Sequence, residues 1–251
     1  MMMRGQSSRL IATRSWRRCV GTVRDEWGDE AFAREWTFKG GVDRTNPERQ
    51  RFQKMLGTLV KKRLASSVAG EGVLDIGCGS GLSAKAIVES VGAIPRLVGV
   101  DGSEAMLTLA KEVCPEMTTK HVDFTKPLEV ALGGPFKAVI CSQVLHELPL
   151  EAKSAAVQLA RSALAPGGCF YIQDRFLKAV EPGVPADDYE AIWEVLKNDD
   201  TMPWPQYSNY IQDKLDDATS EEALVALLKE HFDDVEVLYR VFNRSLIVAR
   251  V

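Results

Sequence analysis

The stretch VLDIGCGSG, residues 73–81, decides the fold of this chain of 251 residues. A short apolar run ends in three glycines, Gly77, Gly79 and Gly81, separated by single residues. Glycines at the end of a first strand let backbone N–H groups approach a ligand, because no Cβ stands between them. The dinucleotide fingerprint is G-x-G-x-x-G, but here the third glycine comes one residue early and Leu82 follows it. The stretch therefore predicts a strand–turn–helix unit that binds a nucleotide-like cofactor, whose identity stays open at this point.

The rest of the chain predicts the architecture around this unit. Strands are expected at residues 73–77, 96–101, 119–123, 137–142 and 167–174, and helices at 82–91, 103–113 and 150–164. A helix over 46–65 precedes them, and a helix over 220–231 is followed by two strands within 235–251. Alternating strands and helices indicate βαβ units with both faces of the sheet covered. The expected fold class is α/β: a doubly wound sheet, mostly parallel, with one antiparallel strand from the C-terminal hairpin, N-terminal helices and an inserted lid.

Residues 25–251 are predicted to form one domain, because this length is near the limit for a single hydrophobic core. The lid is expected as an insertion at about residues 180–218, where four prolines break the strand–helix alternation. Aromatic side chains that could cover a substrate are Trp36 and, in the insertion, Trp193, Trp204, Tyr207 and Tyr210. The aromatic segment that contains Trp27, Phe32, Trp36 and Phe38 has two interpretations: a helix packed on the core, or a flap over a pocket.

The first 24 residues differ from the rest in charge. They contain six arginines and no acidic residue, whereas the whole chain has 31 basic and 35 acidic residues. An arginine-rich, acid-poor N-terminus resembles an organelle transit peptide. It predicts a mitochondrial or plastid location, and the alternative is a disordered basic tail on a cytoplasmic protein.

The composition also bears on whether the protein binds nucleic acid, a membrane or a metal ion. The acidic body disfavours a nucleic-acid partner, because phosphate contacts dominate such binding. No apolar run approaches the roughly 20 residues that a membrane span needs. The five cysteines include no C-x-x-C pair and the three histidines lie far apart, so no metal site is expected. The oligomeric state stays open.

Carboxylates follow the predicted strands at positions that suit a nucleoside. Asp101 closes the second strand, where it can accept hydrogen bonds from both ribose hydroxyls. Asp123 and Phe124 close the third strand, where an acid can accept from an adenine amine and an aromatic ring can pack on the base. Asp75 lies inside the first strand, where a carboxylate is costly unless it is paired.

Five stretches in this order, VLDIGCGSG, VGVDGSEAML, HVDF, AVICSQVLHEL and LAPGGCFYIQD, resemble class I S-adenosylmethionine-dependent methyltransferases over about residues 50–175. The resemblance implies a Rossmann-like fold and S-adenosyl-L-methionine as cofactor. It also implies methyl transfer to a small molecule, similar to enzymes of the ubiquinone and menaquinone branch. Asp75 would face the ammonium group and Asp101 would hold the ribose. The other implied cofactor contacts are the three glycines around the methionine part, Asp123 and Phe124 at the adenine, and Ser142 and Gln143 near the sulfonium.

Two residues are candidates for catalysis. His146 follows the fourth strand, near the expected methyl acceptor, and imidazole ordinarily titrates near neutral pH, so His146 is a candidate general base. The alternative is that His146 caps or packs a helix. Asp174, at the end of the fifth strand, is the second candidate, and its alternative role is a salt bridge with Arg175.

Three other functions compete with small-molecule methylation. A tRNA-modifying methyltransferase is disfavoured by the acidic body, and a dehydrogenase is disfavoured by Leu82 in the fingerprint. A non-catalytic, methyltransferase-like protein that binds the cofactor is the third alternative.

Overall fold

The computed structural model describes residues 25–40, 48–68, 71–128, 130–176, 219–241 and 243–251. The predicted tail at 1–24 and the predicted lid at 180–218 lie outside these residues. The lid residues Trp193, Trp204, Tyr207 and Tyr210 lie there as well. The division of the chain into tail, domain and lid therefore stays a prediction.

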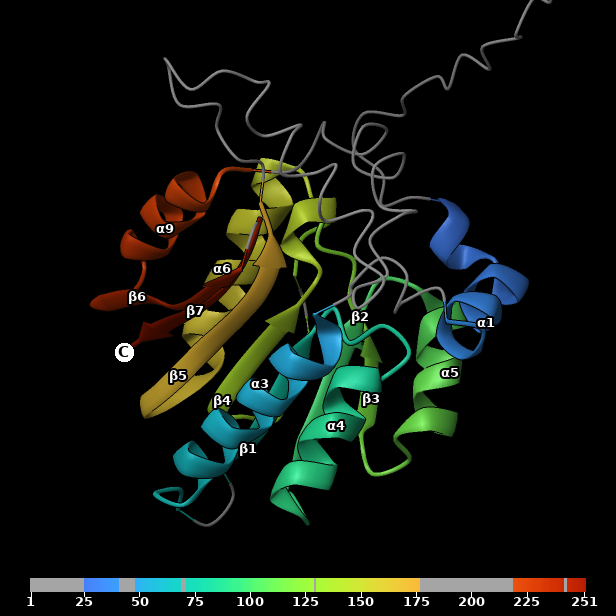
Figure 1. Cartoon of the computed structure of the whole chain (residues 1–251), viewed down its shortest axis with the longest axis horizontal. Coiled ribbons are helices and arrows are strands. Elements are labelled where there is room, and N and C mark those ends of the chain that lie inside the picture. The colour runs from blue at the N-terminus through green and yellow to red at the C-terminus, as the bar shows by residue number, and fades with distance from the viewer. Residues whose placement is uncertain (1–24, 41–47, 69–70, 129, 177–218, 242) are drawn as a thin grey trace, which may run out of the picture.

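The described strands form one seven-stranded sheet in the order β3-β2-β1-β4-β5-β7-β6 (Figure 1). β1 pairs in parallel with β2 and β4, whereas β7 runs antiparallel to both β5 and β6. The predicted α/β sheet with one antiparallel strand from a C-terminal hairpin is thus confirmed. The strands are β1 (Gly72–Ile76), β2 (Leu97–Asp101), β3 (Thr118–His121), β4 (Phe136–Ser142), β5 (Leu164–Arg175), β6 (Asp234–Val241) and β7 (Arg244–Arg250).

Helices cover both faces of this sheet (Figure 1). On one face α3 (Arg49–Leu64), α4 (Leu82–Val91) and α5 (Glu104–Val113) pack over an apolar cluster that includes Leu56, Ile87 and Leu107. On the other face α6 (Leu150–Ala163) and α9 (Glu221–Lys229) pack through residues such as Val157 and Leu228. The remaining elements are the short 3₁₀ helices η1 (Asp25–Gly28) and η2 (Leu145–Glu147), and the helix α1 (Glu30–Phe38).

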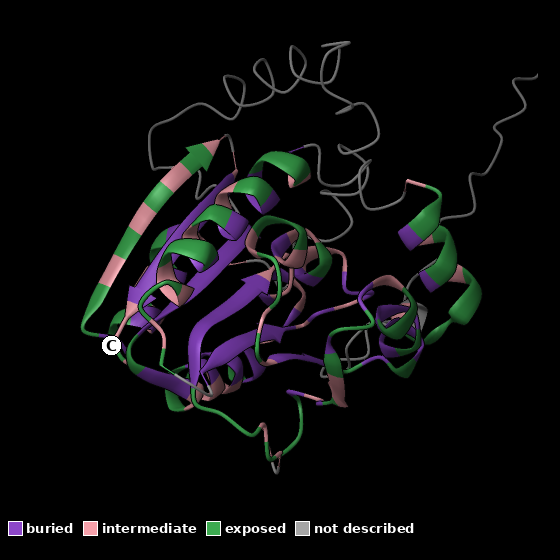
Figure 2. Ribbon diagram, turned by 90° about the horizontal axis from the view of Figure 1, so that it is seen from below, coloured by how far each residue is buried: buried purple, intermediate pink, exposed green. Residues whose placement is uncertain are grey.

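Burial follows position in the sheet. Figure 2 shows the inner strands buried, and β4 has every residue from Phe136 to Cys141 buried. The edge strand β6 alternates between exposed and half-buried residues instead. Inner parallel strands lie between two helix layers, so they place only their carboxyl ends and the following loops within reach of a ligand.

Local signals set several element boundaries. Ser103 and Ser220 cap α5 and α9, since their side chains accept hydrogen bonds from the N–H groups of Met106 and Ala223. Several predicted boundaries shift by two or three residues. α3 begins at Arg49 instead of residue 46, and α9 ends at Lys229 instead of residue 231. β5 begins at Leu164, which was expected to be the last residue of the helix, instead of at Gly167. β3 ends at His121, so Asp123 lies in the following turn rather than in the strand.

Among the described residues, no helix is long and apolar enough to cross a membrane. The same residues contain no group of three His, Cys, Asp or Glu side chains placed to hold a metal ion.

Candidate functional site

A cavity of about 190 Å³ lies at the carboxyl ends of β1, β2 and β4. From β1 the sheet continues through β2 on one side and through β4 on the other. This is the switch point where open α/β sheets bind ligands. The cavity brings together nine of the predicted site residues: Trp36, Gly77, Gly79, Asp101, Asp123, Phe124, Ser142, Gln143 and His146. Asp75, Gly81 and Asp174 are not among the residues that line it.

The glycine turn has a backbone that only glycine adopts without strain. Gly77, Gly79 and Gly81 have φ angles of +67°, +51° and +80°. A Cβ on Gly77 would also lie 2.4 Å from a methyl group of Val144. A Cβ on Gly79 would meet nothing within 4 Å, so this residue faces open space in the cavity. Gly81 instead is the N-cap of α4, and its N–H donates to the Cys78 carbonyl.

Asp101 ties the end of β2 to the glycine turn. Its Oδ2 accepts from the Gly79 N–H at 2.8 Å, and its Oδ1 accepts from the Ser103 N–H at 2.9 Å. Burial raises the pKa of Asp101, while the hydrogen bonds from Ser103 and Gly79 oppose that shift. Each carboxylate oxygen can accept more than one hydrogen bond, so Asp101 keeps acceptor capacity toward the cavity.

Asp75 lies deeper than the resemblance implied. Its side chain is 1% exposed, and its Oδ2 has no hydrogen-bond partner among the described residues. Burial, reinforced by the nearby charge of Asp101, raises the pKa of Asp75 well above its usual range. Burying a carboxyl group without a partner costs less free energy when the group is protonated than when it is ionised. The predicted contact with an ammonium group therefore stays a prediction.

Asp123 and Phe124 line the cavity beside the end of β3. The Asp123 Oδ1 accepts from the Thr125 N–H at 3.0 Å and from the Thr125 hydroxyl at 2.6 Å. Its Oδ2 lies 2.8 Å from the Lys126 Nζ. Partial burial opposes the change, but the hydrogen bonds from Lys126 and Thr125 lower the pKa of Asp123 to about 2. Asp123 thus stabilises the turn that it begins, through Thr125 and Lys126. Phe124 is 6% exposed and belongs to the core, although it also lines the cavity.

Ser142 and Gln143 lie where β4 ends. The Ser142 hydroxyl donates to the Gln173 side-chain oxygen at 2.9 Å, and the Gln143 N–H donates to the Gln173 carbonyl at 2.8 Å. Gln143 has a φ of +60°, and among the described residues it is the only non-glycine residue with a positive φ. Strain of this kind gathers at functional sites. The Gln143 Nε2 is buried and has no hydrogen-bond partner within the described part of the chain.

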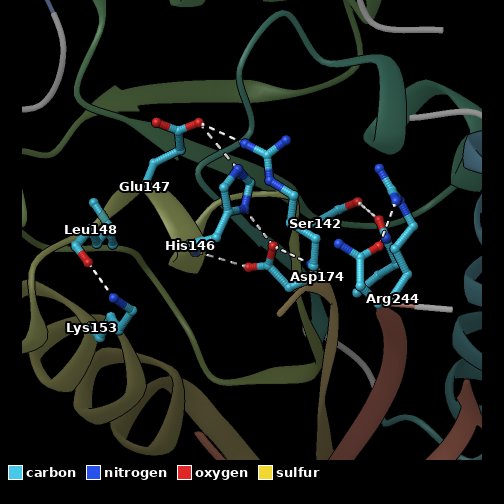
Figure 3. A network of polar contacts seen from close by, with 10 residues as sticks. Ser142, His146, Glu147, Leu148, Lys153, Asp174 and Arg244 are labelled. Atoms are coloured by element: carbon cyan, nitrogen blue, oxygen red, sulfur yellow. Dashed lines mark hydrogen bonds and ion pairs between the residues drawn. The ribbon is translucent and has the colours of Figure 1, made fainter. Parts of the chain in front are cut away.

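His146 is held between two carboxylates (Figure 3). Its Nδ1 lies 2.5 Å from the Asp174 Oδ1, and its Nε2 lies 3.1 Å from the Glu147 Oε1. The same Glu147 oxygen accepts from the Arg175 guanidinium at 3.2 Å. A neutral imidazole carries one N–H, so it can donate to only one of these carboxylates at a time. The imidazole ring therefore has a fixed orientation at the cavity wall and a carboxylate partner at each nitrogen.

Asp174 and Arg175 do not form the salt bridge considered from the sequence. Asp174 is 1% exposed, lies behind His146, and also accepts from the Arg175 backbone N–H at 2.8 Å. The Arg175 side chain points to Glu147 instead and lines the cavity. Asp174 therefore contacts His146 and does not itself line the cavity.

Several lining residues were not predicted. Glu147 and Arg175 each adjoin a predicted residue, so a search for charged neighbours of His146 and Asp174 would have found them. Trp27 belongs to the aromatic segment for which a flap over a pocket was one of two interpretations, but it was not chosen as a site residue. Met106 is an ordinary apolar position of a helix, and no sequence signal distinguishes it.

Comparisons with known proteins agree with this geometry. Residues 73–168 match a family described as a methyltransferase domain. A ubiquinone biosynthesis O-methyltransferase of Dechloromonas aromatica is 34% identical over 112 residues, which are 43% of this chain and 46% of that protein. The chain thus spans about half the length of the curated relatives it matches.

Solved structures share the fold at low sequence identity. A putative O-methyltransferase of Nostoc punctiforme superposes with a TM-score of 0.58 at 18% identity, covering 90% of this chain and 60% of that one. The plantazolicin methyltransferase BpumL, in complex with a monoazolic desmethylPZN analogue and SAH, gives a TM-score of 0.56 at 16% identity. That match covers 85% of this chain and 80% of the other. These likenesses show a Rossmann-like fold shared with methyltransferases.

Proposed function

We propose that this chain, a class I S-adenosylmethionine-dependent methyltransferase by domain family and fold, methylates a hydroxyl group of a small molecule. The observation that carries the hydroxyl assignment is the position of His146. It lines the same cavity as the glycine turn, and Asp174 holds its ring at 2.5 Å. A hydroxyl acceptor must lose a proton, so it needs a base at this place. The O-methyltransferase name of the matched relatives supports the same choice.

The residues around the cavity fit the methyl donor. Gly79 leaves open space where a side chain would stand, and Asp101 offers carboxylate oxygens for a ribose. Phe124 supplies an apolar surface for the adenine ring. Gln143, expected near the sulfonium, has an N–H₂ group without a hydrogen-bond partner among the described residues. When bound, S-adenosylmethionine supplies a methyl group on a positively charged sulfur, so the protein has only to align the acceptor and accept its proton.

The proton then goes to His146. With its N–H at Nδ1 directed to Asp174, the ring has a lone pair at Nε2, which can accept the proton of the acceptor hydroxyl. The resulting imidazolium is stabilised by the Asp174 carboxylate at Nδ1. Glu147 must first leave the Nε2 nitrogen, and Arg175 is the partner that can hold it away from the ring. Asp174 thus fixes the tautomer, while Glu147 and Arg175 control access to the base.

Two alternatives make different predictions. A tRNA acceptor would give binding that falls steeply with salt, whereas a small neutral acceptor would not. A non-catalytic cofactor-binding protein would bind S-adenosylmethionine without ever releasing S-adenosylhomocysteine. The acidic composition of the chain outside its first 24 residues favours neither nucleic acid nor another polyanion.

The test combines binding with turnover on the full chain. Calorimetry with S-adenosylmethionine, S-adenosylhomocysteine and NAD should show binding of the first two only. A screen of phenols, aliphatic alcohols, amines and thiols, read as S-adenosylhomocysteine release, should find turnover with a hydroxyl acceptor. His146→Ala should then lower kcat by about 10²–10⁴, the usual contribution of a general base, and leave cofactor affinity unchanged.

The matched control for that variant is His231→Ala, since His231 lies beyond α9 and away from the cavity. Binding of NAD alone would contradict the donor assignment. Turnover only with amines or thiols, or full activity of His146→Ala, would contradict the hydroxyl assignment.

We further infer that residues 1–24 direct the protein to a mitochondrion or plastid, on the strength of six arginines without an acid. Fusion of these residues to a fluorescent reporter tests the idea, and a reporter that stays in the cytosol would contradict it.

A further inference from the structure

Three aromatic rings from the N-terminal segment form a cluster beside the cavity. Trp27 of η1 packs edge-on against Phe32 and Trp36 of α1, with ring centroids 5.3 and 5.2 Å apart. Phe32 and Trp36 stack at 6.0 Å. Trp27 and Trp36 line the cavity, whereas Phe32 supports them from outside it. Two indole rings therefore form part of the cavity wall.

Within the described residues, this cluster packs on α5. Ala33 of α1 is fully buried and packs against Ala105 and Leu109 of α5. The Ser103 hydroxyl, at the start of α5, donates to the Trp27 carbonyl. Figure 1 shows α1 lying beside α5, at the β2–β3 side of the sheet. The N-terminal segment thus takes its position from the helix that follows β2.

That attachment decides which end of the cavity the indoles cover. Asp101, the expected ribose partner, ends β2 next to α5. His146 and Arg175 lie at the ends of β4 and β5. The strands β2 and β5 are separated by β1 and β4, which at the usual strand spacing is about 14 Å. The two tryptophans are therefore on the donor side of the cavity and away from the base.

We propose that Trp27 and Trp36 form the wall for the adenosine half of S-adenosylmethionine, so that the N-terminal segment holds the methyl donor rather than the acceptor. The inference rests on the proposed function, because it takes the cavity as the donor site. It differs from the expectation that Trp36 belongs to a substrate lid. Its chemical basis is that an indole face packs on a purine through dispersion and π contacts. These contacts are the same for S-adenosylmethionine and S-adenosylhomocysteine, which differ only at the sulfur.

The variant Trp36→Ala tests the proposal in the full chain. Its affinity for S-adenosylhomocysteine, measured by calorimetry, should fall about tenfold, the size of one base–aromatic contact. The affinity for adenosine alone, measured by competition, should fall by the same factor, since the lost contact is to the adenine ring. Trp36→Phe should lose less, because it keeps an aromatic face. The KM for the acceptor, at saturating donor, should stay within about twofold.

Phe38→Ala is the matched control, because Phe38 ends the same helix, is 54% exposed and does not line the cavity. It should leave the affinity for S-adenosylhomocysteine unchanged. If Trp36→Ala does not fold by circular dichroism, Trp36→Leu replaces it, with the same expected loss because it keeps apolar bulk without a ring.

Three results would overturn the proposal. The first is unchanged affinity for S-adenosylhomocysteine with a raised acceptor KM, which would make Trp36 part of an acceptor lid. The second is an equal loss in Phe38→Ala, which would indicate general weakening of α1. The third is a loss for S-adenosylhomocysteine without one for adenosine. Failure of the unmodified chain to bind S-adenosylhomocysteine would instead contradict the proposed function itself.

Discussion

Replacement of Asp174 by Asn is the sharpest test of how the base is held. The carboxylate accepts from the His146 Nδ1 at 2.5 Å, from the Arg175 N–H at 2.8 Å and from the His146 N–H at 3.3 Å. An amide oxygen at the Oδ1 position can keep the two shorter hydrogen bonds. Its N–H₂ group would then face the His146 N–H across the longest contact. The variant therefore keeps the shape of the site and removes the charge that stabilises an imidazolium.

The expected cost follows from that lost charge. A hydrogen bond to a charged group contributes about 1.5–3 kcal/mol, compared with about 1 kcal/mol for a neutral one. Because the Asn side chain keeps a neutral hydrogen bond, the loss is the difference, about 0.5–2 kcal/mol, which corresponds to a fall in kcat of about 2- to 30-fold. The affinity for S-adenosylhomocysteine should not change, because Asp174 does not line the cavity.

The assay is steady-state turnover with both substrates saturating, for Asp174→Asn, His146→Ala and the double variant. Since Asp174 acts through His146, the double variant should be no slower than His146→Ala alone. The control is Asp233→Asn, which changes an exposed acid at the start of the C-terminal hairpin. Multiplied losses in the double variant, or a loss below twofold in Asp174→Asn, would refute the orienting role.

Three further predictions concern the donor side. Asp101→Ala should weaken S-adenosylmethionine binding by at least tenfold in calorimetry, because it removes the ribose acceptor and the carboxylate that ties Gly79 in place; unchanged binding would refute both roles. Gly77→Ala should lower the free energy of unfolding by roughly 1–3 kcal/mol in urea titration, and Val144→Ala in the same chain should restore only part, because the φ of +67° stays unfavourable. Asp123 should contribute to the free energy of unfolding above its ordinary pKa of 3.8, and this contribution is lost as the pH falls toward its folded pKa of about 2. In Asp123→Asn, the free energy of unfolding should therefore depend less on pH between these two values. A pH dependence identical to that of the unmodified chain would contradict this.

Much of the donor side could be predicted from the sequence because its signals are local. The three glycines and Asp123 follow a strand within a few residues, Asp101 ends one, and a parallel sheet brings such positions to one edge. The start of the following helix was also predicted to within one residue. Asp75 shows the limit of this reasoning, since a position in the motif did not reveal that its side chain is buried outside the cavity wall.

The acceptor side depends on contacts between segments far apart in the chain. His146 and Asp174 are separated by 28 residues and meet because β4 and β5 pair with Ser142 opposite Gln173. A shift of that register by one residue would turn the Asp174 side chain to the other face of the sheet. Nothing in the sequence near His146 specifies the register, so the pair could be proposed as two candidates but not as a unit. The aromatic wall has the same origin, since the packing of Ala33 on α5 carries no sequence signature.

Glu147 links His146 to Arg175 at the cavity wall. One of its oxygens lies 3.1 Å from the His146 Nε2 and 3.2 Å from the Arg175 guanidinium, so the base and the cation share a single carboxylate oxygen. An acceptor hydroxyl that reaches Nε2 must take the place of Glu147 there. Arg175 makes this exchange less costly, because Glu147 keeps an ionic partner when it leaves the ring. If His146 is the base, as we propose, such a site would expose it only when an acceptor replaces Glu147.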